Sequence, residues 1–229
     1  MDLKNKIIVI TGAASGLDLE LVKLFSKEEV KIVASDLNEE KLKNLPPHAA
    51  SLSFPADVSK EDEVKNLAAK TFSEFGKIDI WINNAGVWLP YSRVSDLDMS
   101  RVRQMFDINV FGTIYGCRSA LSVMEKQNFG TILNIISISA LEPHLESASY
   151  GASKRAVDGF TKGLRLEVET YEGNAIKILS VYPGGIKTAL FDEQKPDNYK
   201  DYLEPSFVAE RIISNLKLEN PKEELVITS

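Results

Sequence analysis

Short apolar runs alternate with helical patterns along the whole chain, and this alternation limits what the chain can fold into. Most runs are apolar almost throughout instead of alternating with polar residues, which is typical of parallel strands covered on both faces. The sequence therefore predicts a doubly wound α/β fold with a seven-stranded parallel sheet. The predicted strands are Ile7–Ile10, Lys31–Ser35, Ser51–Phe54, Ile78–Ile82, Thr131–Ser137, Ile176–Val181 and Leu225–Thr228.

Helix signals lie between several of these strands. Asn38 is in position to cap a helix after the second strand, and Ser59 with Asp62 resembles a capping box after the third. Gly76 is expected to end that helix. Its core-facing stripe is predicted to consist of Val64, Leu67, Ala68, Phe72 and Phe75.

The domain organisation follows from length and continuity. A chain of 229 residues with 44% hydrophobic residues can bury one sizeable core. No linker, repeat or low-complexity tract interrupts the pattern, so residues 1–229 are predicted to form a single domain. The least regular segment is 189–205, and a loop of that length in a compact domain indicates a lid or a substrate loop.

Charge, hydropathy and cysteine content exclude several classes of function. The formal net charge of −6 argues against nucleic acid or an anionic membrane as the main partner. No apolar run is long enough for a membrane span or a signal peptide. The single cysteine, Cys117, is expected to be a buried packing thiol and suits a reducing compartment, so we expect a cytoplasmic protein. His48 and His144 have no ligand-type neighbours at metal-binding spacing, so no metal is expected.

A glycine turn follows the first strand directly. Gly12 and Gly16 stand between that strand and a helical pattern, where glycine lets the backbone approach a pyrophosphate at the helix N-terminus. Asp36 ends the second strand, 24 residues after Gly12, where a carboxylate can accept hydrogen bonds from the adenosine ribose and would repel a 2′-phosphate. The alternative interpretation is that Asp36 is an ordinary turn residue. No lysine or arginine stands at Ser15 or Leu37, where a 2′-phosphate would favour one.

Four motifs occur in order on the expected elements: Thr11-Gly12-x-x-x-Gly16, Asn83-Asn84-Ala85-Gly86, Ser137 followed by Tyr150-Gly151-Ala152-Ser153-Lys154, and Pro183-Gly184-Gly185-Ile186-Lys187-Thr188. One Tyr-x-x-x-Lys match alone would carry little weight. Together, the four motifs resemble the short-chain dehydrogenase/reductase family over essentially the whole chain. The resemblance implies a Rossmann-like fold and a nicotinamide dinucleotide cofactor, and Asp36 favours NAD.

The spacing of Tyr150 and Lys154 has a chemical reason. Residues four apart on a helix share a face. A phenol has a reference pKa near ~10, too high for a general acid/base at neutral pH, and a nearby ammonium favours the phenolate. We therefore expect Lys154 to lower the pKa of Tyr150.

The resemblance also implies roles for particular residues. Tyr150 would exchange a proton with the substrate oxygen, Ser137 would hydrogen-bond that oxygen, and Asn109 would support a water relay. Ser139 is an alternative to Ser137. The cofactor would be bound by Gly12, Ser15, Gly16, Leu17, Asp36, Asp57, Val58, Asn84, Ala85, Gly86, Tyr150, Lys154, Pro183, Ile186 and Thr188. The substrate cleft would include Val87, Trp88, His144, Leu145, Tyr182, Leu190 and Phe191.

The expected function is therefore hydride transfer between NAD(H) and a secondary alcohol or ketone, with a small carbonyl or alcohol compound as substrate. The alternative is a catalytically inactive cofactor-sensing or scaffold protein of the same fold. A nucleotide-sugar epimerase is a third interpretation, but only about forty residues follow the sixth strand. The resemblance further implies a homodimer or homotetramer built partly on helices around residues 100–124 and 150–170.

Asp18 departs from the dinucleotide fingerprint, which has its third glycine at this position. A carboxylate here suits the helix N-terminus but would face the phosphates of a bound dinucleotide. We expect one of two outcomes. Either Asp18 weakens cofactor binding by repulsion, or its side chain turns outward into water and has little effect.

Overall fold

The computed structural model describes residues 2–228 and has the predicted sheet. Its seven strands are all parallel and lie in the order β3-β2-β1-β4-β5-β6-β7. The strands are β1 (Ile7–Thr11), β2 (Lys31–Asp36), β3 (Leu52–Pro55), β4 (Ile80–Asn83), β5 (Phe129–Ile135), β6 (Ala175–Pro183) and β7 (Glu224–Ile227). Each predicted strand overlaps one of these, which confirms the doubly wound α/β fold.

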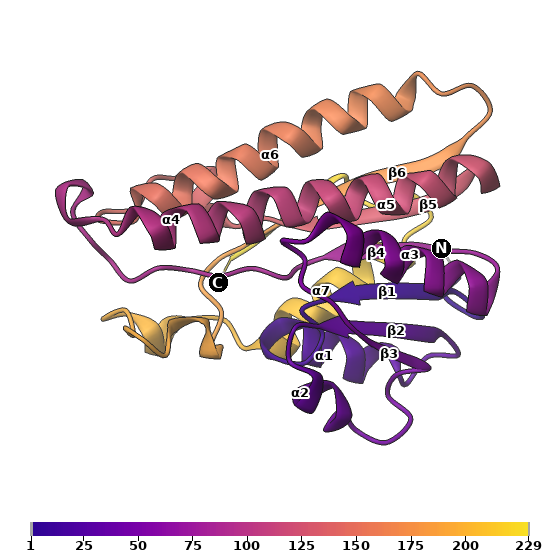
Figure 1. The fold of residues 1–229 in the computed structure, drawn as a ribbon, viewed down its shortest axis with the longest axis horizontal. Helices are drawn as coiled ribbons and strands as arrows, with labels where there is room; N and C mark the ends of the chain where they lie inside the picture. The colour runs from indigo at the N-terminus through magenta and orange to yellow at the C-terminus, as the bar shows by residue number, and fades with distance from the viewer. Residues whose placement is uncertain (1, 229) are drawn as a thin grey trace.

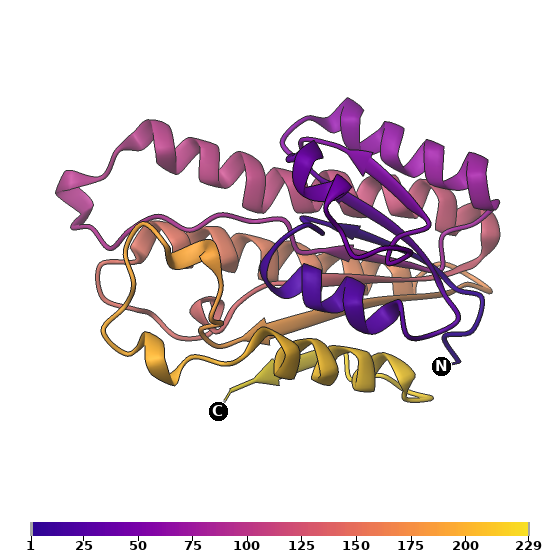
Figure 2. The same cartoon turned by 90° about the horizontal axis from the view of Figure 1, so that it is seen from below.

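Helices cover both faces of the sheet (Figures 1 and 2). The α-helices are α1 (Gly16–Phe25), α2 (Glu39–Lys43), α3 (Glu61–Phe75), α4 (Met99–Phe106), α5 (Gly112–Gln127), α6 (Ala148–Glu169) and α7 (Pro205–Lys217). A π-helical turn, η2 (Asp107–Phe111), joins α4 to α5. The 3₁₀ turns are η1 (Val94–Asp96), η3 (Ile138–Ala140), η4 (Ala189–Phe191) and η5 (Tyr199–Asp201).

Two hydrophobic layers separate the helices from the sheet. In β1, Ile8 and Ile10 pack against α1 and α7 on one face, whereas Ile7 and Val9 belong to the layer under α3, α5 and α6 on the other. All four side chains are buried. This arrangement explains why the strands are apolar without alternation, because both sets of side chains in each strand pack against helices.

The helix signals were correct at some positions and wrong at others. The side chain of Asn38 accepts a hydrogen bond from the amide of Lys41 as predicted, and Gly76 ends α3 in the left-handed conformation. The capping box at Ser59 is wrong. Its hydroxyl donates to Asp57, and α3 begins two residues later without a side-chain cap. Phe72 is also not part of the buried stripe, because 48% of it is exposed.

The strand order reverses between β1 and β4, and the crevice of a doubly wound sheet opens beyond the carboxyl ends of its strands at that point. The segment 189–205 passes over this end of the molecule, and Figure 2 shows it as a loop standing away from the helical layers. It is more ordered than the sequence suggested. It contains η4 and η5, and Leu203 returns to pair with Ile186.

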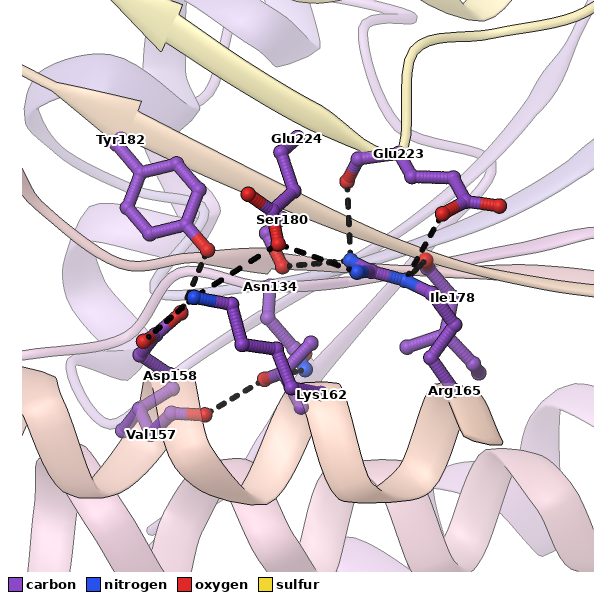
Figure 3. A network of polar contacts seen from close by, with 11 residues as sticks. Asn134, Val157, Asp158, Lys162, Arg165, Ile178, Ser180, Tyr182, Glu223 and Glu224 are labelled. Carbon is purple, nitrogen blue, oxygen red and sulfur yellow. Dashed lines mark hydrogen bonds and ion pairs between the residues drawn. The ribbon is translucent and has the colours of Figure 1, made fainter. Parts of the chain in front are cut away.

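A polar network fixes α6 against the edge of the sheet (Figure 3). The Arg165 guanidinium donates to the carbonyl of Ile178 at 3.0 Å and to the hydroxyl of Ser180 at 3.1 Å. Two turns nearer the start of α6, Asp158 accepts a hydrogen bond from the Tyr182 hydroxyl at 2.6 Å. These contacts fix the orientation of the helix that carries Tyr150 and Lys154. Within residues 2–228, no helix is long and apolar enough to cross a membrane.

Candidate active site

A cleft of about 630 Å³ opens at the carboxyl ends of the strands. This volume lies in the usual range for ligand pockets. With the exception of Asn109, every residue predicted to bind the cofactor or to act in catalysis lines it: Gly12, Ser15, Gly16, Leu17, Asp36, Asp57, Val58, Asn84, Ala85, Gly86, Ser137, Tyr150, Lys154, Pro183, Ile186 and Thr188. The sheet thus brings together residues from six loops that are far apart in the sequence.

The glycine turn forms one end of the cleft. Gly12 has a φ of +75°, and a Cβ at this position would stand 3.0 Å from the Cα of Ala85. Gly16 has a φ of +55°, and a Cβ there would lie 3.3 Å from the Thr188 methyl group. Any other residue would be strained at either position. The resulting cradle at the start of α1 has the backbone shape that a pyrophosphate requires, so these residues fit a dinucleotide.

Asp36 connects two parts of this cradle. Its carboxylate accepts hydrogen bonds from the amide of Ala14 at 3.1 Å and from the amide of Asn38 at 2.9 Å. It is therefore a turn residue that also lines the cleft, and the two interpretations from the sequence do not exclude each other. Lys41 lines the same end of the cleft and was not considered from the sequence.

Asp57 and Val58, two of the residues predicted to bind the cofactor, lie where β3 leads into α3. Asp57 is held by its own loop, because its carboxylate accepts hydrogen bonds from the amide and hydroxyl of Ser59. Val58 packs onto Gly112 at the start of α5, where an added Cβ would lie 2.9 Å from the Val58 side chain. The local hydrogen bonds of Asp57 and the packing of Val58 against α5 together hold this wall of the cleft in place.

Ser137, Tyr150 and Lys154 meet in the middle of the cleft. Ser137 follows β5, and the other two residues lie one turn apart at the start of α6. The Ser137 side chain is close enough to the Tyr150 hydroxyl to lower its pKa in part, whereas Ser139 contributes its backbone amide to the Ser137 oxygen at 3.1 Å. The geometry therefore favours Ser137 over Ser139 as the partner of the tyrosine.

The protonation of this group differs from the sequence-based expectation. Burial raises the pKa of Tyr150 to about 12, although the hydrogen bond from Ser137 lowers it in part, and burial lowers the pKa of Lys154 to about 8. The Lys154 ammonium lies 5.8 Å from the centre of the Tyr150 ring and donates to the carbonyl of Ile135 at 3.3 Å. The prediction that Lys154 lowers the Tyr150 pKa is therefore wrong for the protein without ligands, because desolvation favours the neutral form of both side chains.

Asn109 lies just behind the cleft, in the π-helical turn between α4 and α5. Its side chain exchanges two hydrogen bonds with the backbone of Val87, at 2.8 and 2.9 Å, and donates a third to the Ser153 hydroxyl at 3.2 Å. A Cβ on Gly86 would lie 3.2 Å from the Asn109 oxygen and 3.8 Å from the Lys154 nitrogen. Asn109 thus fixes the loop after β4 beside Lys154. π-turns of this kind often occur at functional sites.

Asp18 does not turn outward. Only 1% of it is exposed, it lines the cleft, and its carboxyl accepts a hydrogen bond from the Asn84 side chain. Burial, with a smaller contribution from Asp36, raises the Asp18 pKa well above its usual range, although Asn84 opposes this shift. The expectation of a solvated side chain is therefore wrong.

The other end of the cleft is aromatic. The Trp88 ring packs against Tyr91 and Phe191, with ring centres 5.2 and 5.1 Å apart, and Phe191 packs against Tyr202 at 5.3 Å. Tyr91 and Tyr202 line the cleft, and the sequence analysis did not predict either of them. For Tyr202 a signal was available, because the polar segment 189–205 contains two tyrosines, Tyr199 and Tyr202.

Two residues assigned to this end are wrong. Tyr182 is completely buried beneath α6, where it is bonded to Asp158, and Leu145 is 88% exposed. Neither is among the residues that line the cleft, whereas the other five expected there (Val87, Trp88, His144, Leu190 and Phe191) all line it.

Comparisons with known proteins agree with this geometry. The family model for short chain dehydrogenases matches residues 6–199. An uncharacterised oxidoreductase of Staphylococcus aureus strain MRSA252 is 36% identical over 214 residues, which cover 92% of this chain and 90% of that protein. One from Staphylococcus saprophyticus is 35% identical over 98% of this chain and 94% of its own length. The chain belongs to the short-chain dehydrogenase/reductase family, and it is an oxidoreductase of that family.

Solved structures show the same fold. A 3-ketoacyl-(acyl-carrier-protein) reductase from Brucella melitensis complexed with NADH superposes with a TM-score of 0.90 at 25% identity, covering 98% of this chain and 97% of that one. The protein ElxO with NADP bound superposes with a TM-score of 0.87 at 28% identity, covering 97% of both chains. The fold of this family binds a nicotinamide cofactor, and these two relatives hold different ones.

Proposed function

We propose that this protein transfers a hydride between NAD(H) and a ketone or secondary alcohol, with Tyr150 as the general acid/base. One observation carries the proposal. The phenol of Tyr150 lies next to Ser137 and Lys154 and lines the same cleft as the glycine cradle of α1. A catalytically inactive sensor or scaffold of the same fold would have no need of this arrangement.

The chain's own residues account for the proton. With a pKa of about 12, Tyr150 is a neutral phenol at pH 7 and can donate its proton to a carbonyl oxygen. A nicotinamide held in the cleft would supply the hydride for the carbonyl carbon, which balances the reduction to an alcohol against oxidation of the cofactor. Ser137 holds the substrate oxygen next to the phenol, and the Lys154 ammonium stabilises the phenolate that remains until solvent returns the proton. The unliganded protein is therefore poised for reduction.

The substrate end favours a neutral, apolar carbonyl compound. Trp88, Phe191 and Tyr202 supply flat apolar walls. Apart from Lys154, the described residues that line this end include no lysine or arginine, so an acidic substrate would have no partner for its charge. His144 also lines the cleft and is a candidate partner for a polar substituent.

The test is a panel of ketones and aldehydes with NADH, followed by the loss of NADH absorbance. We expect turnover of neutral aromatic or branched ketones and much lower rates with keto acids. Tyr150→Phe should lower turnover at least about 100-fold, because the proton donor is lost, while NADH binding stays largely intact. Turnover above a few per cent of wild type in Tyr150→Phe would require another proton donor. No turnover of any substrate by the wild type would favour the sensor or scaffold.

We also propose that NAD(H) is preferred over NADP(H). Asp36 places a carboxylate at the end of the cleft where the adenosine ribose would lie, and it would repel a 2′-phosphate. Lys41 at the same end would attract one, so the preference depends on which charge is closer to the ribose. We expect NADH to bind at least tenfold more tightly, or about 1.4 kcal/mol. Asp36→Asn should reduce that ratio and Lys41→Ala should increase it, as measured by cofactor fluorescence.

We further propose a homo-oligomer that uses α4, α5 and α6. The helices α5 and α6 run side by side (Figure 1). Leu166 in α6 exposes 66% of its surface, and Phe111, in η2 directly before α5, exposes 46%. Sedimentation at micromolar concentration tests this. A strictly monomeric protein would contradict the oligomer but not the enzymatic proposal.

A further inference from the structure

Asp18 is a buried acid with one polar contact among residues 2–228. Its Oδ2 accepts a hydrogen bond from the Asn84 side chain. Its Oδ1 is also buried and has no hydrogen-bond partner among residues 2–228. No cation is among the groups that set its protonation, and the neighbouring charge that acts on it is the like charge of Asp36.

This environment favours the uncharged acid. A buried carboxylate needs a cation or several donors to offset its lost hydration, and Asp18 has one amide donor. Burial raises its pKa well above the usual range, and Asp36 raises it further. Because Oδ2 accepts from Asn84, the acid proton belongs on the unpartnered Oδ1.

Asp18 lies where its protonation state affects cofactor binding. Asp18 lines the cleft together with Gly12, Ser15 and Gly16, in the first turn of α1. Its Oδ2 stands 3.1 Å from where a Cβ on Gly12 would be, so the carboxyl group packs directly against the glycine cradle. A dinucleotide in this cradle brings phosphate oxygens, which are strong acceptors and carry negative charge.

We propose that this protein binds the dinucleotide with Asp18 in its uncharged form, so that cofactor affinity is coupled to one proton. The proposal rests on the dinucleotide site proposed above. Because Oδ1 is buried, Asp18 acts on the dinucleotide through its charge: the neutral acid does not repel phosphate, whereas the ionised carboxylate does. Affinity for NADH should therefore fall as the pH rises through the pKa of Asp18. The direct repulsion expected from the sequence applies only to the ionised form.

Other charged groups at the cleft also affect binding. Asp36, Lys41, Asp57 and Lys154 line it, and Lys154, with a pKa of about 8, loses its charge in the same direction. A fall in affinity with rising pH is therefore not diagnostic by itself. The diagnostic quantity is the ratio of dissociation constants between the wild type and a variant that lacks the Asp18 proton but keeps these four groups.

The experiment measures NADH dissociation constants by cofactor fluorescence from pH 6 to 9.5 at fixed ionic strength. Asp18→Asn keeps the shape and an acceptor for Asn84, and Asp18→Gly removes the side chain. The ratio of wild-type to variant dissociation constants should rise with pH, by up to about tenfold per pH unit above the Asp18 pKa. A ratio independent of pH for both variants, with binding still measurable, would overturn the proposal while leaving the proposed function intact.

A second measurement needs no cofactor. An acid whose pKa is raised in the folded state loses stability as the pH rises from its unfolded value, near ~4, to its folded value. In urea unfolding from pH 4 to 8, the wild type should therefore lose stability relative to Asp18→Asn as the pH rises. If the stability profiles of the wild type and both variants ran parallel, the conclusion that Asp18 is uncharged in the folded protein would be wrong. If none of the three proteins bound NADH at any pH, the proposed function and its coupling to the proton would both fail.

Discussion

The sheet has an amino edge, formed by the amino ends of its strands, and a carboxyl edge, formed by their carboxyl ends. A buried aspartate lies at each edge, and the two have opposite surroundings. At the amino edge, Asp79 is only 3% exposed, and its carboxylate contacts the ammonium groups of Lys6 and Lys77 at 2.9 and 2.8 Å. It also accepts a hydrogen bond from the amide of Ile7 at 2.9 Å. At the carboxyl edge, Asp18 has one amide donor and an oxygen without a partner in the described chain.

The difference in hydrogen-bond partners separates a residue that stabilises the fold from residues that are available to ligands. Burial alone would raise the pKa of Asp79, but the hydrogen bonds from Lys77, Ile7 and Lys6 together lower it, so this residue is a satisfied carboxylate. The carboxyl edge instead collects groups whose neutral forms are favoured by burial, namely Asp18, Tyr150 and Lys154. Such groups are poorly paired within the protein, and they gain partners when ligands enter. The comparison predicts that substitutions at the two edges have separable effects.

The largest effect is expected from Lys154→Ala at the carboxyl edge. Lys154 is buried and donates to a single carbonyl, that of Ile135. Its loss removes the positive charge beside the phenolate, so turnover should fall at least about 100-fold and NADH should bind more weakly. The thermal midpoint should change by only a few degrees, because the ammonium is costly to bury. Urea or thermal unfolding in parallel with kinetics measures both, and a variant that keeps turnover but loses stability would reverse the assignment.

The pH dependence of Lys154 sharpens this point. Its pKa of about 8 lies below the reference value near ~10.4, so the ammonium is lost as the pH rises through about 8. Wild-type turnover should fall above that pH. Lys154→Arg keeps the charge throughout and serves as the control, since any fall that persists in it has another origin. A wild-type profile that stays flat to pH 10 would contradict the lowered pKa.

The sequence predicted the sheet and the site motifs because both are local patterns. The strands are apolar on both faces, and the glycine turn, Asp36 and the Tyr150–Lys154 pair each lie within or next to one element. The Ser59 capping box failed because a competing local bond was available, and its hydroxyl donates to Asp57 instead.

What the sequence could not give depends on packing between distant segments. Tyr202 reaches the cleft because Leu203 pairs with Ile186, and no local sequence pattern predicts that the chain turns back to make this pair. Tyr182 does not line the cleft, because it is buried under α6 and bonded to Asp158. The burial of Asp18 against Asn84, 66 positions away, decided between the two positions that the sequence left open and also favours the uncharged acid over the expected carboxylate. Desolvation likewise raised the pKa of Tyr150, whereas the spacing of Tyr150 and Lys154 had predicted that it would be lowered.

The smallest effect on function is expected at the amino edge, from Asp79→Asn. The change leaves Lys6 and Lys77 without their acceptor charge, but these lysines are partly exposed and can be hydrated. The loss should therefore be about 1–3 kcal/mol of unfolding free energy, or roughly 2–10 °C in the thermal midpoint. Because the Asp79 pKa is lowered in the folded state, its stabilisation is present above the unfolded pKa and is lost as the pH falls through the folded pKa. The difference between wild type and Asp79→Asn should thus shrink on acidification, whereas the advantage of Asp18→Asn over wild type should grow as the pH rises. Unfolding profiles of the three proteins on one pH scale measure both trends. NADH affinity and turnover of Asp79→Asn at 25 °C should match those of the wild type, and a pH-dependent loss of NADH binding in this variant would show that the two edges are not independent.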